Sequence, residues 1–317
     1  MMNYMDFKEE TKNRFMEYMP DEMRDMKAYI RRITKINTTL DGLVIFGEGK
    51  KMQVSPVIYL DNLYDYYKEC GSLEETLLKG VSIMLGAMKE NINVPDIPNV
   101  RENIVFQVIN TIQNQQLLAN LPNRPFHDLS IIYRCIVGSD NDNTFSTVIN
   151  YSIAEYMGFT EEDLFSMAAK NTRRIFPPCV KTMNDVMREI AIKTGMPTEA
   201  ADIMLGELEL DPVMFVISNK IGINGAVSLL YEDELYKLAE RLKSDLYILP
   251  SSIHECIAVS ADIGDPEELA CMVAEINANE VDIEERLSNQ VYHYDKNLRV
   301  LTLATDMSNK SLQYADE

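Results

Sequence analysis

Four residues that could perform hydrolytic chemistry stand together near the C-terminal end of the chain. Ser251, Ser252, His254 and Glu255 lie within five positions of one another. A hydroxyl nucleophile, an imidazole base and a carboxylate that orients the imidazole are the parts of a hydrolase triad. Asp128, which follows a second histidine, is a further carboxylate that the fold could bring to this place. Ser252, His254, Glu255 and Asp128 are therefore the candidate catalytic residues.

The local geometry argues against this chemistry. If the segment is extended, His254 and Glu255 point to opposite faces, whereas a triad needs base and orienting carboxylate in line with the nucleophile. The chain also lacks the Gly-x-Ser-x-Gly elbow that presents a nucleophilic serine in one large hydrolase class. A structural bend that carries a surface histidine is the favoured interpretation, and it leaves open a binding role for Ser251, Ser252 and His254.

Two apolar runs flank this bend and predict short strands. Leu246–Leu249 and Ile253–Val259 have the length and composition of strands, and Pro250 ends the first because it cannot donate to a ladder. A unit of strand, turn, strand and helix recurs three times after residue 128. Its predicted strands are Leu129–Val137 with Phe145–Ile149, Val213–Ser218 with Gly225–Leu230, and the two runs at the bend. Because short turns join only antiparallel neighbours, the predicted class is α+β, with antiparallel sheets and helices packed on a face.

The N-terminal part has a different pattern. Helices are expected over residues 5–18, 62–69 and 72–91, with a small hairpin near residues 43–60 and a mixed segment over 23–36 that we expect to run from helix or turn into strand. Two prolines without periodicity make 93–99 the best linker candidate. We therefore expect an N-terminal domain of residues 1–95 and a main α+β domain of residues 96–317.

Metal and cofactor sites are not expected. The three histidines, His127, His254 and His293, have no metal-binding spacing, although the fold could still bring them together. The five cysteines include no Cys-x-x-Cys pair and favour reduced thiols in a cytoplasmic protein. No glycine-rich phosphate loop is present.

The charge is large and unevenly distributed. The chain of 317 residues has a net charge of −20, and residues 201–317, with 23 acidic and 8 basic side chains, contribute −15 of it. Such a field repels phosphate backbones, so direct nucleic-acid binding is not expected. The field either serves solubility or attracts a basic protein partner. No apolar run has the length of a membrane helix, and the N-terminal residues do not have the pattern of a secretory signal.

Several stretches resemble an uncharacterised family, a domain of unknown function found in clostridial gut bacteria. The resemblance rests on Ser55–Leu60, Phe126–Tyr133, Glu155–Gly158 with Ala169–Thr172, and above all Ser244–Glu255, which contains the motif LPSSIHE. A second uncharacterised family, in bacilli, is distantly similar. The resemblance implies no activity. The residues that match the family pattern are Asp128, Asn150, Asn171, Pro250, Ser252, His254 and Glu255, while Tyr156 stands where we expect tryptophan. The candidate binding residues are Asn150, Asn171, Ser251, Ser252 and His254.

Two functions follow as hypotheses. The first is a cytoplasmic, non-enzymatic binding protein without a cofactor, whose acidic C-terminal third contacts a basic protein partner. In one variant it is an accessory or counter-defence factor of a mobile element. The second is a hydrolase that uses His254 with a serine or carboxylate brought close by the fold. The oligomeric state does not follow from the sequence.

Overall fold

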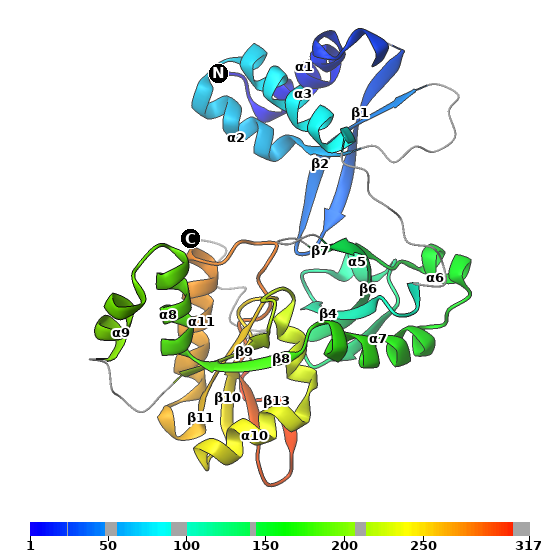
Figure 1. Cartoon of the computed structure of the whole chain (residues 1–317). Coiled ribbons are helices and arrows are strands. Elements are labelled where there is room, and N and C mark those ends of the chain that lie inside the picture. The colour runs from blue at the N-terminus through cyan, green and yellow to red at the C-terminus, as the bar shows by residue number, and fades with distance from the viewer. Residues whose placement is uncertain (24, 48–55, 90–99, 140–143, 207–213, 307–317) are drawn as a thin grey trace. The chain divides into compact units, whose positions relative to one another are not determined.

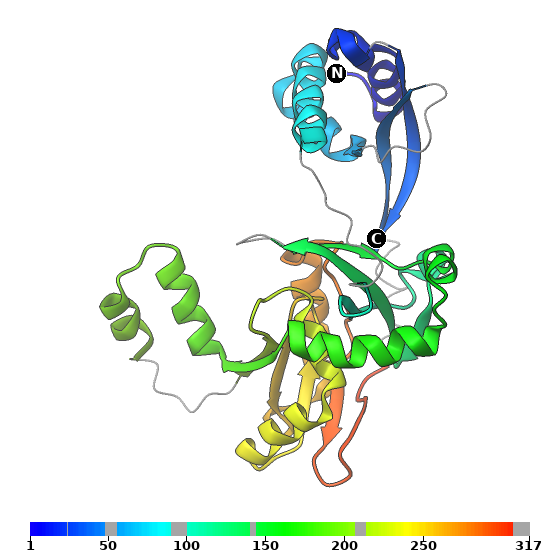
Figure 2. The ribbon, with the colours of Figure 1, turned by 45° about the vertical axis from the view of Figure 1, so that its right-hand side comes forward.

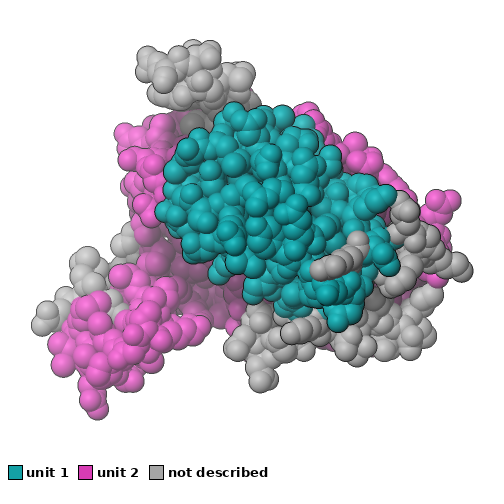
Figure 3. Space-filling view, turned by 90° about the horizontal axis from the view of Figure 1, so that it is seen from above, with its two compact units in different colours: residues 1–94 teal, residues 95–317 magenta. Residues whose placement is uncertain are grey.

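In a computed structural model, the chain divides into two compact units, Met1–Val94 and Pro95–Glu317, which Figure 3 colours separately. The structure describes residues 1–23, 25–47, 56–89, 100–139, 144–206 and 214–306. The expected linker at 93–99 and most of the expected hairpin turn after Gly47 lie outside these ranges.

The first unit packs helices against one three-stranded antiparallel sheet of order β1-β2-β3 (Figure 1). Its elements are α1 (Tyr4–Arg14), η1 (Phe15–Tyr18), η2 (Asp21–Met23), β1 (Met26–Lys35), β2 (Thr38–Gly47), β3 (Ile58–Tyr59), α2 (Leu60–Cys70) and α3 (Leu73–Lys89). The buried Phe7, Phe15, Leu43, Leu63 and Leu77 form its core. Apolar side chains from α1, α2 and α3 thus meet one face of the sheet.

The second unit begins with a four-stranded antiparallel sheet in which β6 is the central strand. The elements are β4 (Ile104–Asn110), α5 (Gln115–Leu118), β5 (Asn123–Phe126), β6 (Leu129–Ser139), β7 (Thr144–Val148), α6 (Tyr151–Met157) and α7 (Glu161–Ile175). The order is β4-β6-β5, and β7 also pairs with β6. Helix α7 lies along β4 (Figures 1 and 2).

A six-stranded antiparallel sheet of order β13-β12-β10-β11-β9-β8 completes the second unit. Its elements are β8 (Pro178–Thr182), α8 (Met183–Lys193), α9 (Thr198–Gly206), β9 (Met214–Asn219), η3 (Gly225–Leu230), α10 (Glu232–Leu242), β10 (Leu246–Leu249), β11 (Cys256–Ser260), η4 (Ala261–Ile263), α11 (Pro266–Asn279), β12 (Tyr292–Asp295) and β13 (Val300–Leu303).

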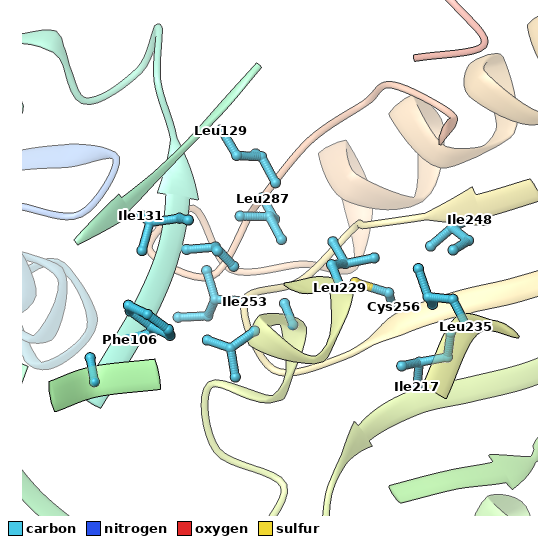
Figure 4. Close-up of a cluster of buried hydrophobic side chains, with 14 of the residues drawn as sticks. Phe106, Leu129, Ile131, Ile217, Leu229, Leu235, Ile248, Ile253, Cys256 and Leu287 are labelled. Atoms are coloured by element: carbon cyan, nitrogen blue, oxygen red, sulfur yellow. The ribbon is translucent and has the colours of Figure 1, made fainter. Parts of the chain in front are cut away.

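Both faces of this six-stranded sheet are buried. Successive side chains of a strand point to opposite faces, and the side chains of each face pack into a core. Leu246 and Ile248 of β10 join a large core with α10, whereas Leu249 turns to the other face and packs against Val273 of α11. The large core also receives apolar side chains from the four-stranded sheet. Figure 4 shows Phe106 and Ile131 of that sheet on one side and Ile248 on the other, with Leu229, Ile253 and Leu287 labelled between them. One hydrophobic core therefore holds the two sheets of the second unit together.

The predicted α+β class with antiparallel sheets is confirmed. Several signals that come from a few adjacent residues also match the structure: Thr160 before three acidic residues and Asp265 before Pro266 each predict the start of a helix. Thr160 and Asp163 form a capping box at the start of α7, and Asp265 caps α11 with Pro266 in its first turn. Gln290–Tyr294 and Val300–Ala304, joined by a short polar turn, also predict a strand pair, and they form β12 and β13.

One element prediction is wrong, and one strand was not predicted. The apolar run Gly225–Leu230 is a buried 3₁₀ helix, so the second repeat lacks its second strand. A β-carbon at Gly225 would collide with Ser218 Oγ and the His254 carbonyl oxygen, which shows how closely the chain turns there. The mixed segment over residues 23–36 does run from a turn into a strand, since the short 3₁₀ turn η2 is followed by β1 from Met26. The proline-led strand β8 was not expected at all; it lies at the sheet edge, where proline is tolerated.

Candidate functional site

The segment that carries the candidate catalytic residues is a six-residue loop between paired strands. Leu249 and Ile257 are partners across β10 and β11, so the predicted second strand begins at Cys256 rather than Ile253. The loop is held by a later segment of the chain, residues 285–288. Leu287 donates its N–H to the Ser251 carbonyl (2.9 Å), and Ile253 donates its N–H to the Glu285 carbonyl (2.9 Å). Long-range backbone hydrogen bonds thus hold the bend in place where the two inner strands β10 and β11 end.

His254 has a protein partner at each ring nitrogen. Its Nδ1 accepts the Asn224 backbone N–H (3.2 Å), and its Nε2 lies 3.3 Å from a Glu285 carboxylate oxygen. Acceptance at Nδ1 places the proton on Nε2, which then faces Glu285. Ser252, which is buried, accepts the backbone N–H of His254 through Oγ (3.0 Å) rather than contacting the ring. The His254 imidazole is therefore paired with the Glu285 carboxylate, whereas the Ser252 hydroxyl bonds to the backbone of the bend.

The neighbouring Glu255 is a half-buried carboxyl group. Burial raises the pKa of Glu255; the nearby His254 lowers it, and the nearby Glu285 raises it further. Glu255 is thus closer to neutral than an ordinary glutamate. The orienting carboxylate beside the imidazole is Glu285, a residue that sequence reasoning did not single out.

A chain of polar side chains leads from His254 into the four-stranded sheet. The Asn224 side-chain oxygen accepts from Gln107 Nε2 (2.9 Å), and Gln107 Oε1 accepts from Arg134 Nη1 (3.1 Å). Arg134 also donates to Ser146 Oγ (2.8 Å), and burial lowers the pKa of this guanidinium. The chain turns at Asn224, which takes a left-handed backbone conformation (φ 52°). The Asn224–Gly225 pair is the sequence signal for this turn, because asparagine tolerates that conformation.

Asp128 belongs to a different group of side chains. It accepts hydrogen bonds from Ser288 Oγ (2.5 Å) and from the hydroxyl of the buried Tyr292. Burial and the Asp128 charge raise the pKa of Tyr292 above its ordinary value. His127 packs its ring edge-on against Tyr292, 5.3 Å between centres, and burial lowers the pKa of His127. Asp128 thus connects the four-stranded sheet to the segment that also supports the His254 loop.

The two asparagines singled out by resemblance have structural partners. Asn150 caps α6, where its side-chain oxygen accepts the Ile153 N–H (2.8 Å). Asn171, on α7, is buried and donates to the carbonyls of Arg101 (2.8 Å) and Ile104 (3.0 Å). Both side chains fix the positions of helices beside the four-stranded sheet.

The three histidines have separate partners. His293 Nε2 lies 3.3 Å from Asp245 Oδ2, and its ring lies beside Tyr247, whereas His127 contacts Tyr292 and His254 contacts Glu285. Among the residues that the structure describes, no group of three or more His, Cys, Asp or Glu could hold a metal ion. In the same residues, no helix is long and apolar enough to cross a membrane.

A hollow of about 630 Å³ opens in the second unit between its two sheets. Five aromatic side chains line it, so we call it the aromatic hollow: Phe106, Phe126, Phe165, Tyr231 and Tyr294. Leu229, Leu230 and Leu235 from η3 and α10 line it too, together with His127. Its size and apolar lining are those of sites that bind small molecules or single side chains.

Three arginines stand around the aromatic hollow, each paired with carboxylates. Arg124 contacts Glu161 (2.8 Å) and Glu162 (2.7 Å) and lies over the Phe165 ring (3.7 Å). Arg173 bonds Asp233 (2.5 Å) and Glu234 (2.9 Å), and Arg299 bonds Glu232 (2.7 Å). We call these five acidic residues the rim carboxylates: Glu161, Glu162, Glu232, Asp233 and Glu234. Lys237 also contacts Asp233 (3.5 Å) and Glu234 (2.8 Å), so the five rim carboxylates face four cations and exceed them by one.

Three of the rim carboxylates, Glu161, Glu232 and Asp233, have a lowered pKa. All five occupy the first turns of α7 and α10, where the helix dipole favours negative charge. The hydrogen bond from Arg173 lowers the pKa of Asp233 to about 2. Hydrogen bonds from Arg299 and then Tyr294 lower the pKa of Glu232. Burial acts to raise the pKa of Glu161, but Arg124 and Tyr133 hold it below the ordinary value. The hollow is therefore apolar within and acidic around its edge.

Sequence reasoning missed the aromatic hollow. Its walls come from β4, β5, β6, α7, η3, α10, β12 and β13, which are distant in the chain and meet only through the fold. The acidic runs Glu161–Asp163 and Glu232–Glu234 were its only visible signal. Either run alone indicates no more than the start of a helix.

The comparisons with known proteins give a family but no activity. The model of a family of unknown function, DUF5688, matches residues 4–296. Neither the search of curated proteins nor the search of solved structures finds a match.

Proposed function

Since the chain belongs to the DUF5688 family of unknown function, its role has to be inferred from the molecule itself, and we propose that it is a non-enzymatic binding protein. Its acidic C-terminal region would receive a basic protein partner. The observation that supports this proposal most is the aromatic hollow with its rim carboxylates. It combines an apolar cavity, which can take an aliphatic or aromatic side chain, with an excess of negative charge at the entrance.

The two parts of this site would act at different stages of binding. The net charge of −15 over residues 201–317 raises the rate at which a basic partner is encountered, and this attraction weakens with salt. Burial of a side chain in the hollow then supplies affinity, at about 25 cal/mol per Å² of apolar surface. Arginine or lysine beside that side chain would meet the rim carboxylates and the aromatic faces. A segment that alternates apolar and basic residues fits both requirements.

A narrower form of the proposal concerns the partner's own function. Basic protein surfaces commonly serve to bind nucleic acids, so an acidic protein that covers such a surface would block it. We propose a cytoplasmic accessory or counter-defence factor of a mobile element as this narrower form. The clostridial origin and the role of LPSSIHE (Leu249–Glu255) as a family signature belong to the same proposal.

A hydrolase centred on His254 is the second candidate. The pair of His254 and Glu285 favours it, because a base oriented by a carboxylate is half of a triad. It is the weaker candidate, since Asn224 occupies Nδ1 and Ser252 is engaged by the backbone. If His254→Ala abolished the hydrolysis of a panel of nitrophenyl esters by the purified chain, the hydrolase would replace the binding protein as the proposed function.

The binding proposal is tested with a short fluorescein-labelled peptide of alternating leucine and arginine, measured by fluorescence anisotropy. Leu230→Glu places a carboxylate in the wall of the hollow, and we expect at least about tenfold weaker binding because that charge must be desolvated. Met272→Glu is the matched control, since this exposed α11 residue lies away from the hollow. The same peptide with glutamate in place of arginine should not bind.

Two results would overturn the proposal. One is equal affinity of the wild type and a folded Leu230→Glu variant for the leucine–arginine peptide. The other is an affinity that stays constant between about 50 and 300 mM salt, because the rim charges would then contribute nothing to binding.

A further inference from the structure

The three-stranded sheet of the first unit has two unlike faces, and one of them packs against its helices. The register of β1 and β2 pairs Ala28 with Ile45 and Ile30 with Leu43, and these four side chains belong to the core with the helices. The residues between them in sequence point to the opposite face. This second face is made of side chains of a different kind.

Cations and aromatic rings gather on this second face, together with the apolar Ile33, Leu40 and the buried Val44. Lys27, Tyr29, Arg31 and Lys35 come from β1, Phe46 from β2 and Tyr59 from β3, and we call these six residues the cationic–aromatic face. The register confirms that they share it, because Lys27 pairs with Phe46, while Gly42 is the partner of both Arg31 and Tyr59.

The side chains of this face are in contact with one another. The Arg31 guanidinium lies 5.1 Å from the Phe46 ring centre, and Lys35 Nζ lies 4.0 Å from that of Tyr59. The rings of Tyr29 and Phe46 are 6.3 Å apart. Tyr29 is 41% exposed, and Arg31 is exposed as well. The rings are therefore held in place beside cations while Tyr29 still presents its surface to solvent.

The charge of this sheet is opposite to that of the whole chain. Within their described bounds, strands β1, β2 and β3 carry four cations and one carboxylate, Asp41. Asp41 pairs in register with Arg32, which places it on the helix-covered face, and there its carboxylate contacts Lys8 (2.6 Å). The cationic–aromatic face thus receives no carboxylate from its own strands.

We propose that the cationic–aromatic face binds single-stranded nucleic acid. Fixed cations can contact successive phosphates, and aromatic rings on a sheet can stack with unpaired bases. A duplex keeps its bases stacked inside and could use only the cations, so the rings favour a single strand. An anionic membrane is a poorer fit, because Tyr29 is the one exposed ring among the three aromatic side chains of this face.

The net charge of −20 led us to expect no direct nucleic-acid binding, and the proposal restricts binding to the place where the local charge is reversed. Salt at physiological concentration screens charges beyond about 8 Å. Contacts at the face are therefore governed mainly by the charges within that range, among them Lys27, Arg31 and Lys35. The proposal is independent of the aromatic hollow.

The test uses the full chain and a fluorescein-labelled oligothymidylate of about 20 nucleotides, long enough for the site sizes of such surfaces. Tyr29→Ala should weaken binding roughly five- to hundredfold, the range found when one stacking ring is removed. Arg31→Glu should weaken binding and reduce the slope of log affinity against log salt by about 0.7 for the phosphate contact it removes.

Lys68→Glu is the matched control. It makes the same charge change as Arg31→Glu in the same unit, but on helix α2, where Lys68 is 49% exposed and pairs with Asp65. We expect its affinity for the oligothymidylate to stay within about twofold of the wild type. Melting curves of all three variants show whether each remains folded.

The proposal is overturned if oligothymidylate does not bind at about 50 mM salt, or if a DNA duplex of the same length binds equally or more tightly. Binding of phosphatidylserine vesicles without binding of the oligonucleotide would also overturn it. So would a loss of oligothymidylate affinity in Lys68→Glu that equals the loss in Arg31→Glu. Unchanged affinity of a folded Tyr29→Ala variant would also contradict it, because the rings would then not take part.

Discussion

At the scale of single residues, the structure assigns the polar side chains of the 250–255 loop to the bend itself. Ser252 accepts the His254 N–H, and His254 accepts the Asn224 N–H. These bonds satisfy backbone donors that the strands leave without partners where they end, which explains why a loop without helix or strand structure can be half-buried. The residues therefore contribute to stability in ways that substitutions can measure.

Ser252→Ala should destabilise the fold by about 0.5 to 1.5 kcal/mol, because one hydrogen bond to the backbone is lost. Pro250→Ala should cost well under about 1 kcal/mol, since it mainly loosens the unfolded chain. Urea denaturation of both variants measures these losses. A Pro250→Ala variant that is less stable than Ser252→Ala would show that the bend depends on the proline ring instead of the serine hydroxyl.

Asp233 should give the second unit a small stability that depends on pH. Arg173 lowers the pKa of Asp233 to about 2, below the ordinary 3.8, so the charged form is favoured in the folded state. This stabilisation is complete above about pH 4 and is lost as the pH falls through about 2. Asp233 is 42% exposed, so its value is under about 1 kcal/mol.

Asp233→Asn should accordingly be slightly less stable than the wild type at pH 7. The difference should shrink between about pH 4 and 2, where the wild-type carboxylate becomes protonated. Guanidinium denaturation at a series of pH values measures it. A difference that is constant down to pH 2 would mean that the ion pair with Arg173 is not its cause.

At the scale of helices and strands, the sequence predicts those features that depend only on adjacent residues. Thr160 and Asp265 mark helix starts because the capping bonds form within three residues. Gly225–Leu230 was predicted wrongly because an apolar run of six residues suits a buried strand and a buried helical turn equally well. Long-range contacts with Ser218 and His254 decide between them, and no local pattern records such contacts.

The candidate site shows the same division. The bend at Pro250 was predictable, but its partners, Glu285 and Asn224, come from segments about 30 residues away and carry no motif of their own. Asp128 was singled out by sequence, yet the fold places it with Ser288 and Tyr292 and away from His254. Which carboxylate meets which base is set by the packing of two sheets, and packing is not visible in a single sequence.

Tyr292→Phe tests how the two sheets of the second unit are connected. Tyr292 lies on β12 and donates to Asp128 at the start of β6, so the variant leaves that carboxylate with one donor fewer. We expect a loss of about 1 to 3 kcal/mol in the free energy of unfolding, measured with urea. Tyr247→Phe, a half-buried position on the neighbouring strand β10, is the control. Equal stability of Tyr292→Phe and the wild type would exclude a connecting role for the hydroxyl.

At the scale of the whole molecule, charge and surface are divided between two units. The net negative charge lies mostly in the second unit, because residues 95–317 have 35 acidic and 17 basic side chains whereas residues 1–94 have 15 and 13. The aromatic hollow of the second unit is edged by five carboxylates, whereas all charged residues of β1 in the first unit are cations. The net charge alone predicted a basic partner and could not reveal a local reversal of sign. A protein that binds a basic protein through one unit and a single strand through the other would join components of a nucleoprotein assembly.

The measurement that tests the proposed binding site most directly is hydrogen exchange of the full chain with and without the leucine–arginine peptide. The first-turn amides of α10 have few intrahelical partners and should exchange quickly when the chain is alone. Peptide bound at the aromatic hollow should slow exchange there, in residues 161–173 and in residues 294–301, which form its edge. Saturating peptide that leaves these three segments unchanged, or that protects only residues 1–94, would contradict the proposal.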